Sequence, residues 1–378
     1  MDDFQLSLPG PTECDPEVLQ ELARPNLPHY GEIWMGIYSR IVRRLKEISR
    51  ASGSMYVIPG SGSAGLDAVF TSLGSQRGVL LNNGTFGNRI ATIASRQLSH
   101  VKVIEKAPGE AFDLGEVEKA LGAGDIDLLG VVHGETSTGM LNDLSPLSEL
   151  CRTYNTLFVV DAVSTLGGVP LDVDALGIDF CVSASQKALG SLPGLAIVGV
   201  SQRGWAAMPP EDEIKSWYLN LRTWAAYEKE WSDWHPYPVT LPVHLLLCLD
   251  KALEIIQREG LEARWERHRR VSEELQGKLE QLGVGLFIGE KSSRLATVTA
   301  GVLPSGMESQ DLQKHLRESF GILIAGGVGP LRKRIFRVGH MGYSAQIGLV
   351  NRVIAGIRDF VEQREAASSL EREIDVDK

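Results

Sequence analysis

The sequence predicts an α/β fold with a doubly wound parallel sheet, followed by a smaller α+β domain. Short apolar segments alternate with helical patterns through the middle of the chain, which is typical of parallel α/β sheets. Two segments, 128–132 and 157–160, are continuously apolar, as expected for strands covered on both faces. After Gly283 short strands mix with helices, which indicates the second domain.

The expected elements of the large sheet alternate in order along the chain. We expect strands at 55–58, 79–81, 101–104, 128–133, 157–160 and 195–200. We expect the helices between them at 64–73, 88–98, 114–121 and 147–154.

A long helical pattern follows at 243–282, and Gly260 is expected to interrupt it. Its second half, 262–280, is densely charged and is expected to present a solvated face. In the smaller domain we expect strands at 296–299 and 335–338 and helices at 309–319 and 346–364. The stretch from Glu365 onward is charged and is expected to form a frayed tail.

Composition and charge exclude several classes of protein. At 378 residues, 43% hydrophobic and 23% charged, the chain is neither disordered nor a coiled coil. Its 38 basic and 48 acidic residues give a net charge of −10, which disfavours a nucleic-acid partner. No window approaches 18 uninterrupted apolar residues, and the first ten residues do not resemble a signal peptide. We therefore expect a cytoplasmic protein without a membrane partner.

The cysteines and histidines argue against a metal site. Cys14, Cys151, Cys181 and Cys248 are scattered without a CxxC pair, which disfavours zinc binding and a disulfide framework. We expect them to be small apolar residues in a reducing compartment. The histidines outside the motifs described below have no ligand spacing, so no metal is expected.

A glycine-rich segment, PGSGSAG at 59–65, lies between an expected strand and an expected helix. Backbone N–H groups at a helix N-terminus bind phosphate, so the segment predicts a phosphate cradle; the alternative is a turn without a ligand. Its glycines Gly60, Gly62 and Gly65 also fit a dinucleotide fingerprint. That fingerprint requires an acidic residue at the end of the next strand, where this chain has Leu-Asn-Asn-Gly instead.

Three single residues carry further signals. Asp161 ends an apolar strand, where ligands bind in open α/β sheets, although an Asp there can also cap a helix. Lys187 lies between an apolar run and small residues; it is either a Schiff-base lysine or an exposed turn residue. Arg337 lies in a short strand and suits either bidentate binding of a carboxylate or a structural salt bridge.

In this order, these residues and the motifs between them resemble the class V aminotransferases, fold-type I enzymes that use pyridoxal phosphate. The resemblance covers nearly the whole chain and is closest to the alanine/serine–glyoxylate (or pyruvate) branch. The motifs that carry it are GP at 10–11, SGS at 61–63, NGTFG at 83–87, HGETSTG at 133–139, DAVS at 161–164, SQK at 185–187, PG at 193–194, YPVT at 237–240, AGG at 325–327 and RVGHMG at 337–342.

The resemblance implies a large domain with a mostly parallel seven-stranded sheet between helices, and a smaller α+β C-terminal domain. It also implies a homodimer with shared active sites. The implied divisions are an N-terminal segment packing with the small domain (1–25), the large cofactor-binding domain (26–245), the small domain (246–365) and a charged tail (366–378).

The resemblance also assigns roles to residues. Lys187 would bind pyridoxal phosphate as a Schiff base and then transfer protons, while Asp161 would keep the pyridine nitrogen protonated. Arg337 would bind the substrate α-carboxylate, with Gly10 beside it. The other cofactor contacts would be Phe86 and Val163 on the two ring faces, Thr136 near the 3′-oxygen, Ser61, Gly62, Ser63 and Gln186 at the phosphate, and Tyr237 and Thr240 at the phosphate of the partner's cofactor.

Four further motif residues are expected to support the site rather than to react. His133 and Glu135 are expected to form a hydrogen-bonded or ionic scaffold. His340 and Met341 are expected to be packing residues.

The expected function is ping-pong transamination from a small amino acid, serine or alanine, to glyoxylate or pyruvate. The segment 26–34 does not resemble its counterpart in the animal alanine–glyoxylate enzymes, so pyridoxamine, ureidoglycine and aspartate stay open as donors. No second arginine is identifiable for a side-chain carboxylate, which favours a neutral donor. A lyase of the cysteine desulfurase kind is disfavoured because residues 322–336 contain no cysteine. A non-catalytic binding protein would not need Lys187.

Overall fold

Seven strands form the central sheet of the larger domain, in the order β2-β10-β9-β8-β5-β3-β4. All neighbouring pairs are parallel except the two made by β10. The strands are β2 (Ser54–Pro59), β3 (Arg77–Asn82), β4 (His100–Glu105), β5 (Leu128–Val132), β8 (Leu157–Asp161), β9 (Phe180–Ala184) and β10 (Leu195–Val200). The predicted α/β class with a mostly parallel sheet is confirmed.

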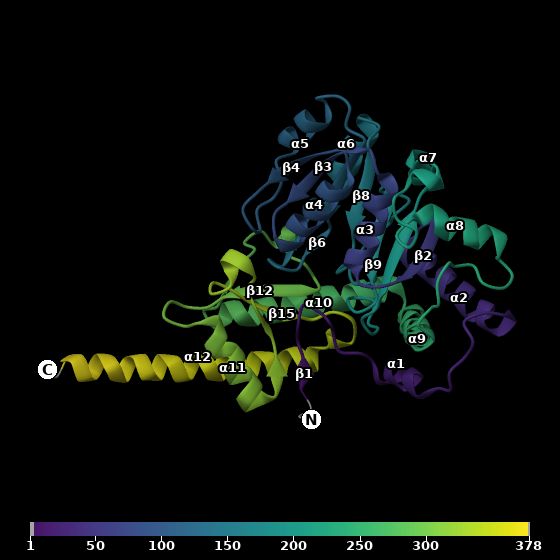
Figure 1. Cartoon of the computed structure of the whole chain (residues 1–378). Coiled ribbons are helices and arrows are strands. Elements are labelled where there is room, and N and C mark those ends of the chain that lie inside the picture. Colours follow the sequence, from purple (N-terminus) through teal and green to yellow (C-terminus); the bar gives the residue numbers. More distant parts are fainter. Residues whose placement is uncertain (1–3, 377–378) are drawn as a thin grey trace.

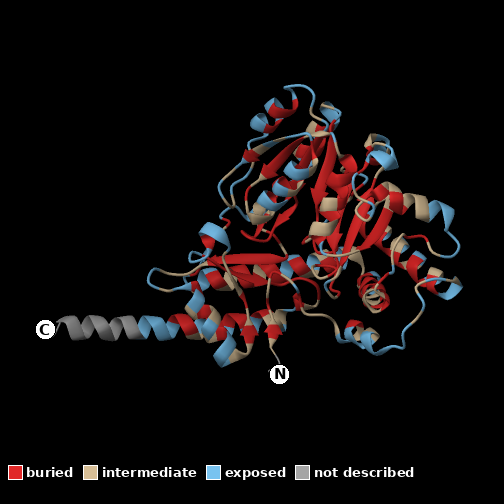
Figure 2. Cartoon of the chain, viewed as in Figure 1, coloured by how far each residue is buried: buried red, intermediate tan, exposed pale blue. Residues whose placement is uncertain are grey.

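The computed structural model describes the backbone of residues 4–376 and the side chains of residues 4–366. In Figure 1 the smaller domain lies beside the large sheet, and both chain ends belong to its side of the molecule. Every residue of β5, β8 and β9 is buried, so the sheet is covered on both faces, as Figure 2 shows. The covering helices of the larger domain are α2 (Glu32–Ser49), α3 (Gly62–Leu73), α4 (Thr85–Gln97), α5 (Leu114–Leu121), α6 (Ser145–Thr153), α7 (Gln202–Ala207) and α8 (Leu221–Glu230).

The smaller domain is built on an antiparallel sheet in the order β11-β12-β15-β14. Its strands are β11 (Gly285–Leu286), β12 (Val298–Val302), β14 (Ala325–Gly326) and β15 (Phe336–Gly339). The helices around it are α10 (Leu261–Gln281), α11 (Ser309–Phe320) and α12 (Ile347–Val376). They bury a separate apolar core that includes Leu275, Leu316, Phe336 and Ile357.

Two connections join the domains. Helix α9 (Val243–Glu259) runs directly into α10 through Gly260, whose φ of +85° suits glycine. Near the N-terminus, β1 (Gln5–Leu6) pairs in parallel with β13 (Ile322–Leu323) of the small domain, while α1 (Pro16–Gln20) packs on α9. The N-terminal segment therefore contacts the small domain at one end and α9 at the other.

The structure differs from the sequence-based expectations at several elements. Strand β9 and helices α2 and α8 were not among the expected elements. Helix α10 does not simply present a charged face to solvent, because Arg264 and His268 are buried on it. Helix α12 continues through the stretch expected to be a frayed tail, since residues 365–376 contain neither Gly nor Pro to end it. Residues 377–378 of that predicted tail lie outside the described part of the chain.

Candidate active site

The glycine-rich segment forms the N-terminus of α3, directly after β2. Ser61 is the N-cap residue, and its side chain does not use the free N–H groups of the first turn. The N–H groups of Gly62 and Ser63 have no intrahelical acceptor. A Cβ at Gly62 would lie 2.6 Å from Val163 Cγ2, so only glycine allows this approach. The helix therefore presents N–H groups and the positive end of its dipole, which is a suitable cradle for a phosphate.

Asp161 ends β8, at the carboxyl edge of the sheet. Its Oδ1 accepts a hydrogen bond of 2.9 Å from the Val163 backbone N–H, whereas Oδ2 has no such partner among the described residues. Burial raises the pKa of this carboxyl to about 6, although the Val163 hydrogen bond opposes the shift. A cationic N–H placed against Oδ2 would favour the carboxylate form.

Lys187 lies in the turn that follows β9. Its Nζ donates a hydrogen bond to the Pro9 carbonyl, from the N-terminal segment. A Cβ at Gly10 would overlap the Lys187 side chain, so a residue without a side chain is needed there. Burial, assisted by the charge of Arg337, lowers the pKa of Lys187 to about 8. Asp161 and Lys187 thus act on each other at one site, and the amine of Lys187 is less basic than that of a surface lysine.

Arg337, in β15, reaches this site from the small domain. Its Nε donates to the Gly326 carbonyl over 2.8 Å, and its Nη1 donates to the Thr136 carbonyl over 2.9 Å. Its Nη2 makes no hydrogen bond with any described residue. Burial lowers the pKa of Arg337, while the nearby Glu135 opposes that shift. The side chain is fixed and still has a donor available for a carboxylate.

Glu135 holds the start of α4, which carries Phe86. Its Oε2 accepts hydrogen bonds of 2.9 Å from the backbone N–H groups of Phe86 and Gly87. Its Oε1 accepts from the Ser137 backbone N–H over 3.0 Å and from the Ser137 hydroxyl over 2.6 Å. The scaffold role predicted for Glu135 is confirmed.

The histidines of the motifs are also structural. His133 Nδ1 lies 3.1 Å from Thr165 Oγ1, and His340 Nε2 lies 2.8 Å from Thr299 Oγ1. Burial lowers the pKa of each histidine to about 4, so both rings are neutral near pH 7. The contact with Thr165 confirms a hydrogen-bonded scaffold role for His133. His340 is fully buried but also makes a hydrogen bond, so it does more than the packing expected of it.

Sequence reasoning missed Arg89. Its guanidinium carbon lies 4.8 Å from the centre of the Phe86 ring, one helical turn away on α4, which is a cation–π contact. Its charge also acts to lower the pKa values of both Asp161 and Lys187. The available signal was the spacing of three residues from Phe86, which puts both side chains on one face of the helix.

Of the other residues predicted to contact the cofactor, some lie near Lys187 and Asp161, and others lie in a different part of the same chain. Thr136 is buried next to Glu135, and the Oε1 of Gln186 is buried without a hydrogen-bond partner. Tyr237 is fully buried elsewhere, with its hydroxyl donating to the His29 carbonyl, and Thr240 is exposed. The predicted roles of Tyr237 and Thr240 at a partner's cofactor stay predictions.

Comparison with known proteins identifies the family. The family model "Aminotransferase class-V" matches residues 60–336. The chain belongs to the class-V aminotransferases. The alanine–glyoxylate aminotransferase of Mus musculus is 32% identical over 94% of this chain and 86% of its own length. The (S)-ureidoglycine–glyoxylate transaminase of Bacillus subtilis is 31% identical over 97% and 94%.

Solved structures agree with this assignment. The crystal structure of alanine–glyoxylate aminotransferase from Nostoc sp. matches with a TM-score of 0.90 and 31% identity over 95% of each chain. The protein is thus an aminotransferase of fold-type I, and its cofactor is pyridoxal phosphate. The residues present fit that cofactor: free N–H groups for a phosphate, a free carboxylate oxygen for a ring nitrogen and a buried amine for an aldehyde.

Among the described residues, no group of three or more His, Cys, Asp or Glu side chains could hold a metal ion. Within the same part of the chain, each helix is too short or too polar to cross a membrane.

Proposed function

We propose that this aminotransferase moves the amino group of serine or alanine to glyoxylate or pyruvate in a ping-pong cycle. The observation that carries the proposal is the Nη2 of Arg337, an unpaired donor on a fixed guanidinium beside Lys187. One such group binds one carboxylate, which all four compounds have. A charge-assisted hydrogen bond from Nη2 to that carboxylate would hold the Cα–N bond of the substrate near the amine of Lys187.

The other residues of the site either hold the cofactor or transfer protons. When bound, pyridoxal phosphate supplies an aldehyde that condenses with amines and a ring that withdraws electrons from the substrate Cα. Because the pKa of Lys187 is lowered to about 8, a larger fraction of this amine is neutral at a given pH than of a surface lysine, and it can take and return the Cα proton. Asp161 Oδ2 would accept from the ring nitrogen, Phe86 and Val163 would pack on the ring faces, and Thr136 would lie near the 3′-oxygen. Ser61, Gly62, Ser63 and Gln186 would hold the phosphate.

Arg89 supports a second candidate donor, aspartate. No described residue forms an ion pair with Arg89, and its guanidinium lies over the Phe86 ring beside the site. A cation there could bind the side-chain carboxylate of a dicarboxylic donor. Serine and alanine remain the first proposal because Arg89 is exposed and already stacks on Phe86, whereas Arg337 is held by two backbone carbonyls.

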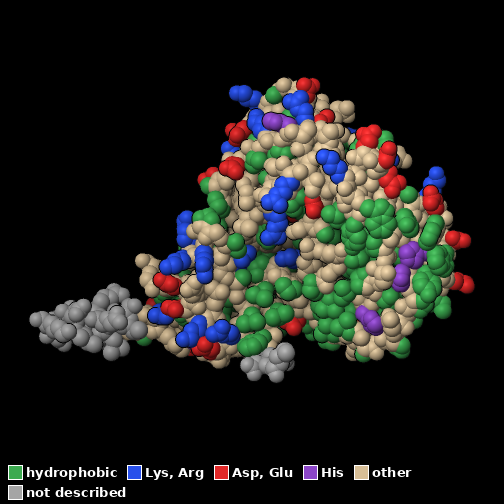
Figure 3. All heavy atoms as spheres, in the orientation of Figure 1, with side chains coloured by type: hydrophobic (Ala, Val, Ile, Leu, Met, Phe, Trp, Pro, Cys, Tyr) green, Lys and Arg blue, Asp and Glu red, His purple; other side chains and the backbone are tan. Residues whose placement is uncertain are grey.

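A homodimer with shared sites is part of the proposal. The rings of Trp217, Tyr227, Trp231, Trp234 and Tyr30 form a continuous series with centroid separations of 5.3–6.4 Å. Four of them are exposed by 41% or more, as is Ile33 on α2. We call these six residues the aromatic patch, and Figure 3 shows hydrophobic side chains gathered on that side, over α2 and α8. So large an exposed apolar surface supports an interface between two subunits.

The residues beneath the aromatic patch support the same proposal. His29 Nδ1 and His235 Nδ1 are buried there without hydrogen-bond partners among the described residues. Tyr237 and Thr240 lie in the adjoining segment, so a subunit docked on the patch would bring its cofactor toward them. A cytoplasmic location is also proposed, since the four cysteines are all unpaired.

The test is an absorbance spectrum of the cofactor-loaded enzyme mixed separately with serine, alanine, aspartate, pyridoxamine and ureidoglycine. We expect serine or alanine to remove the visible band, and glyoxylate or pyruvate to restore it. A response to aspartate that is lost in Arg89→Gln would replace the first proposal with the second. A response only to pyridoxamine or ureidoglycine would reject both, and a failure to form any visible band would reject catalysis.

A further inference from the structure

A buried arginine of α10 contacts the turn that carries Lys187. Arg264 Nη2 donates to the Ala188 carbonyl over 2.8 Å, and its Nε donates to the Gly167 carbonyl over 2.8 Å. Ala188 follows Lys187 directly, so this arginine fixes the backbone next to the reactive amine. The Arg264 side chain is only 4% exposed, and burial lowers its pKa to about 10.

A second arginine, one turn further along α10, contacts the turn that follows the Arg337 strand. Arg267 Nη1 donates to the carbonyls of Gly342 and Ala345 over 3.1 and 2.6 Å. His268 Nε2 accepts from the Gly342 N–H over 3.0 Å, and burial keeps the pKa of this histidine low enough for that role. The same face of α10 therefore holds the backbone just beyond β15.

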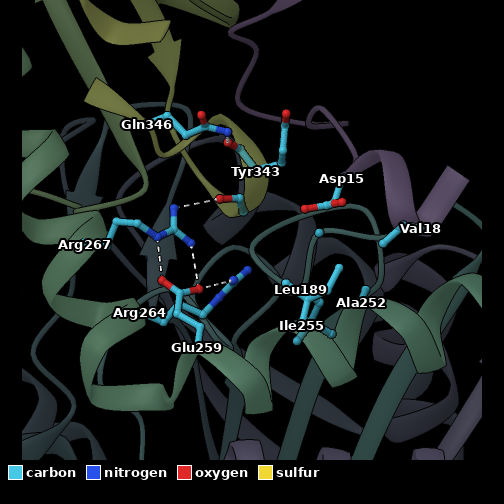
Figure 4. A pocket seen from close by; sticks show the side chains of 12 residues that line it. Asp15, Val18, Leu189, Ala252, Ile255, Glu259, Arg264, Arg267, Tyr343 and Gln346 are labelled. Atoms are coloured by element: carbon cyan, nitrogen blue, oxygen red, sulfur yellow. Dashed lines mark hydrogen bonds and ion pairs between the residues drawn. The ribbon is translucent and has the colours of Figure 1, made fainter. Parts of the chain in front are cut away.

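Glu259, the last residue of α9, joins the two arginines. Its Oε2 accepts from Arg264 Nη1 over 2.9 Å, and its Oε1 accepts from Arg267 Nε over 2.6 Å. Figure 4 shows the carboxylate between the two guanidinium groups, at the wall of a cavity of about 250 Å³. Burial acts to raise the pKa of Glu259, but the hydrogen bond from Arg267 and the charges of both arginines lower it on balance.

The two turns held in this way also touch each other. The Gly190 N–H closes the Lys187 turn by donating to the Lys187 carbonyl over 2.8 Å. A Cβ at Gly342 would lie 3.3 Å from Gly190 Cα and 3.6 Å from the Lys187 oxygen. A shift of either turn would therefore change the distance between Lys187 and Arg337. Because removing charged groups from water is costly, a cluster of one buried and two partly buried charges gives little net stability and is better suited to fixing geometry.

We propose that Glu259, Arg264 and Arg267 form a positioning cluster that sets the Lys187 turn and the Arg337 strand at a fixed separation for transamination. The cluster touches neither substrate nor cofactor and acts through the two turns. The inference rests on the roles proposed above for Lys187 and Arg337. It explains why Arg264 is buried and Arg267 partly buried on α10, a helix whose charged residues the sequence assigns to a solvated face.

The test compares Arg267→Met and Arg267→Lys with a matched control, Arg269→Met. Arg269 is on the same helix and pairs with Glu266 and Glu273, but it is exposed and makes no hydrogen bond to either turn in the described part of the chain. Each variant is purified with its cofactor bound. The measurements are the Michaelis constant for the acceptor acid, kcat, the melting temperature, and the pH midpoint of the visible band, which reports the surroundings of Lys187.

For Arg267→Met we expect the Michaelis constant for the acceptor to rise roughly tenfold, since displacements of about 1 Å have effects up to a hundredfold. The midpoint of the band should move upward, because Arg337 then lowers the proton affinity at Lys187 less. Arg267→Lys keeps the charge beside Glu259 but cannot reach both carbonyls, so its effects should be intermediate. Arg269→Met should match the wild-type enzyme.

Folded Arg267 variants with wild-type Michaelis constants and midpoints would overturn the proposal, even if their melting temperatures fall. If the Met variant does not fold, the Lys variant decides in the same way. Arg337→Ala is measured in parallel. A normal Michaelis constant in that variant would reject the proposed function of Arg337, whereas a raised one together with normal Arg267 variants would reject the positioning cluster alone.

Discussion

Arg337 Nη1 donates a hydrogen bond of 2.9 Å to the backbone carbonyl of Thr136, joining a strand of the small domain to a turn of the large one. Arg337 Nε donates to Gly326 within the small domain. The guanidinium is therefore oriented before any substrate arrives, and its remaining nitrogen, Nη2, has no partner among the described residues. Such preorganisation avoids the entropy of ordering a long side chain at the moment of binding.

This geometry gives the first prediction. Arg337→Ala should lower kcat/KM for the acceptor acid by about 30- to 1,000-fold, because a charge-assisted carboxylate contact is worth about 2–4 kcal/mol. Steady-state kinetics with glyoxylate and pyruvate measure the effect. Arg334→Ala, three residues earlier and exposed, is the matched control and should leave kcat/KM unchanged. Equal kinetics in both variants would remove Arg337 from the site.

The second prediction concerns the pH dependence of cofactor loading. Burial lowers the pKa of Lys187 from 10.5 to about 8, and only the neutral amine attacks an aldehyde. The rate at which the cofactor-free enzyme acquires its visible band should therefore rise with pH and level off above about 8. Stopped-flow absorbance at several pH values measures it, and Lys187→Ala should give no band. A rate still rising at pH 10 would show that the lysine has ordinary basicity.

Much of the large sheet could be predicted because its signals are local. Strands β5 and β8 are continuously apolar, and Asp161 marks the end of β8 by its position alone. Strand β9 has the same length as β5 and β8 but was harder to predict, because Phe180–Ala184 ends in small residues before a turn. The sequence alone shows that Lys187 follows an apolar run. Its lowered pKa could not be predicted, because that shift depends on burial by other segments of the chain.

The contacts that complete the site could not be predicted, because they join distant parts of the chain. Lys187 meets the carbonyl of Pro9, and Arg337 meets that of Thr136. Neither pairing leaves a periodic pattern, since the acceptors are backbone atoms. In α10 the buried Arg264 and the exposed Arg269 have the same local sequence character, and only the packing of the two domains distinguishes them.

The third prediction links Asp161 to stability in the absence of the cofactor. Its pKa is raised from 3.8 to about 6 by burial, so the folded state binds more protons than the unfolded state between these values. This contribution therefore disfavours folding increasingly as pH rises from about 4 to 6, and the penalty is complete above 6. At pH 7 the cofactor-free Asp161→Asn variant should be more stable than wild type by on the order of 1–3 kcal/mol.

Urea unfolding of both cofactor-free proteins at pH 4, 5, 6 and 7 measures the Asp161 effect. The difference between them should grow across this range while the variant loses transamination activity, because an amide does not keep a ring nitrogen protonated. A stability difference that is independent of pH would show that the Asp161 carboxyl has an ordinary pKa.

The fourth prediction concerns Glu135, whose two oxygens accept four hydrogen bonds, two from the start of α4 and two from Ser137. Glu135→Gln replaces one acceptor oxygen by an NH₂ group and removes the negative charge from the helix N-terminus. We expect a loss of about 2–4 kcal/mol in the free energy of unfolding, since buried N–H groups are left without acceptors. Cofactor affinity should also fall, because Phe86 is the second residue of the helix that the carboxylate fixes.

Urea unfolding and titration with pyridoxal phosphate measure these two effects of Glu135→Gln separately. Glu149→Gln, on the exposed surface of α6, is the matched control and should change neither. If Glu135→Gln loses stability but keeps its cofactor affinity, the carboxylate supports the fold without placing Phe86. If it behaves like the control in both measurements, the two hydrogen bonds from Phe86 and Gly87 do not hold the start of α4, and the position of this helix depends on packing instead.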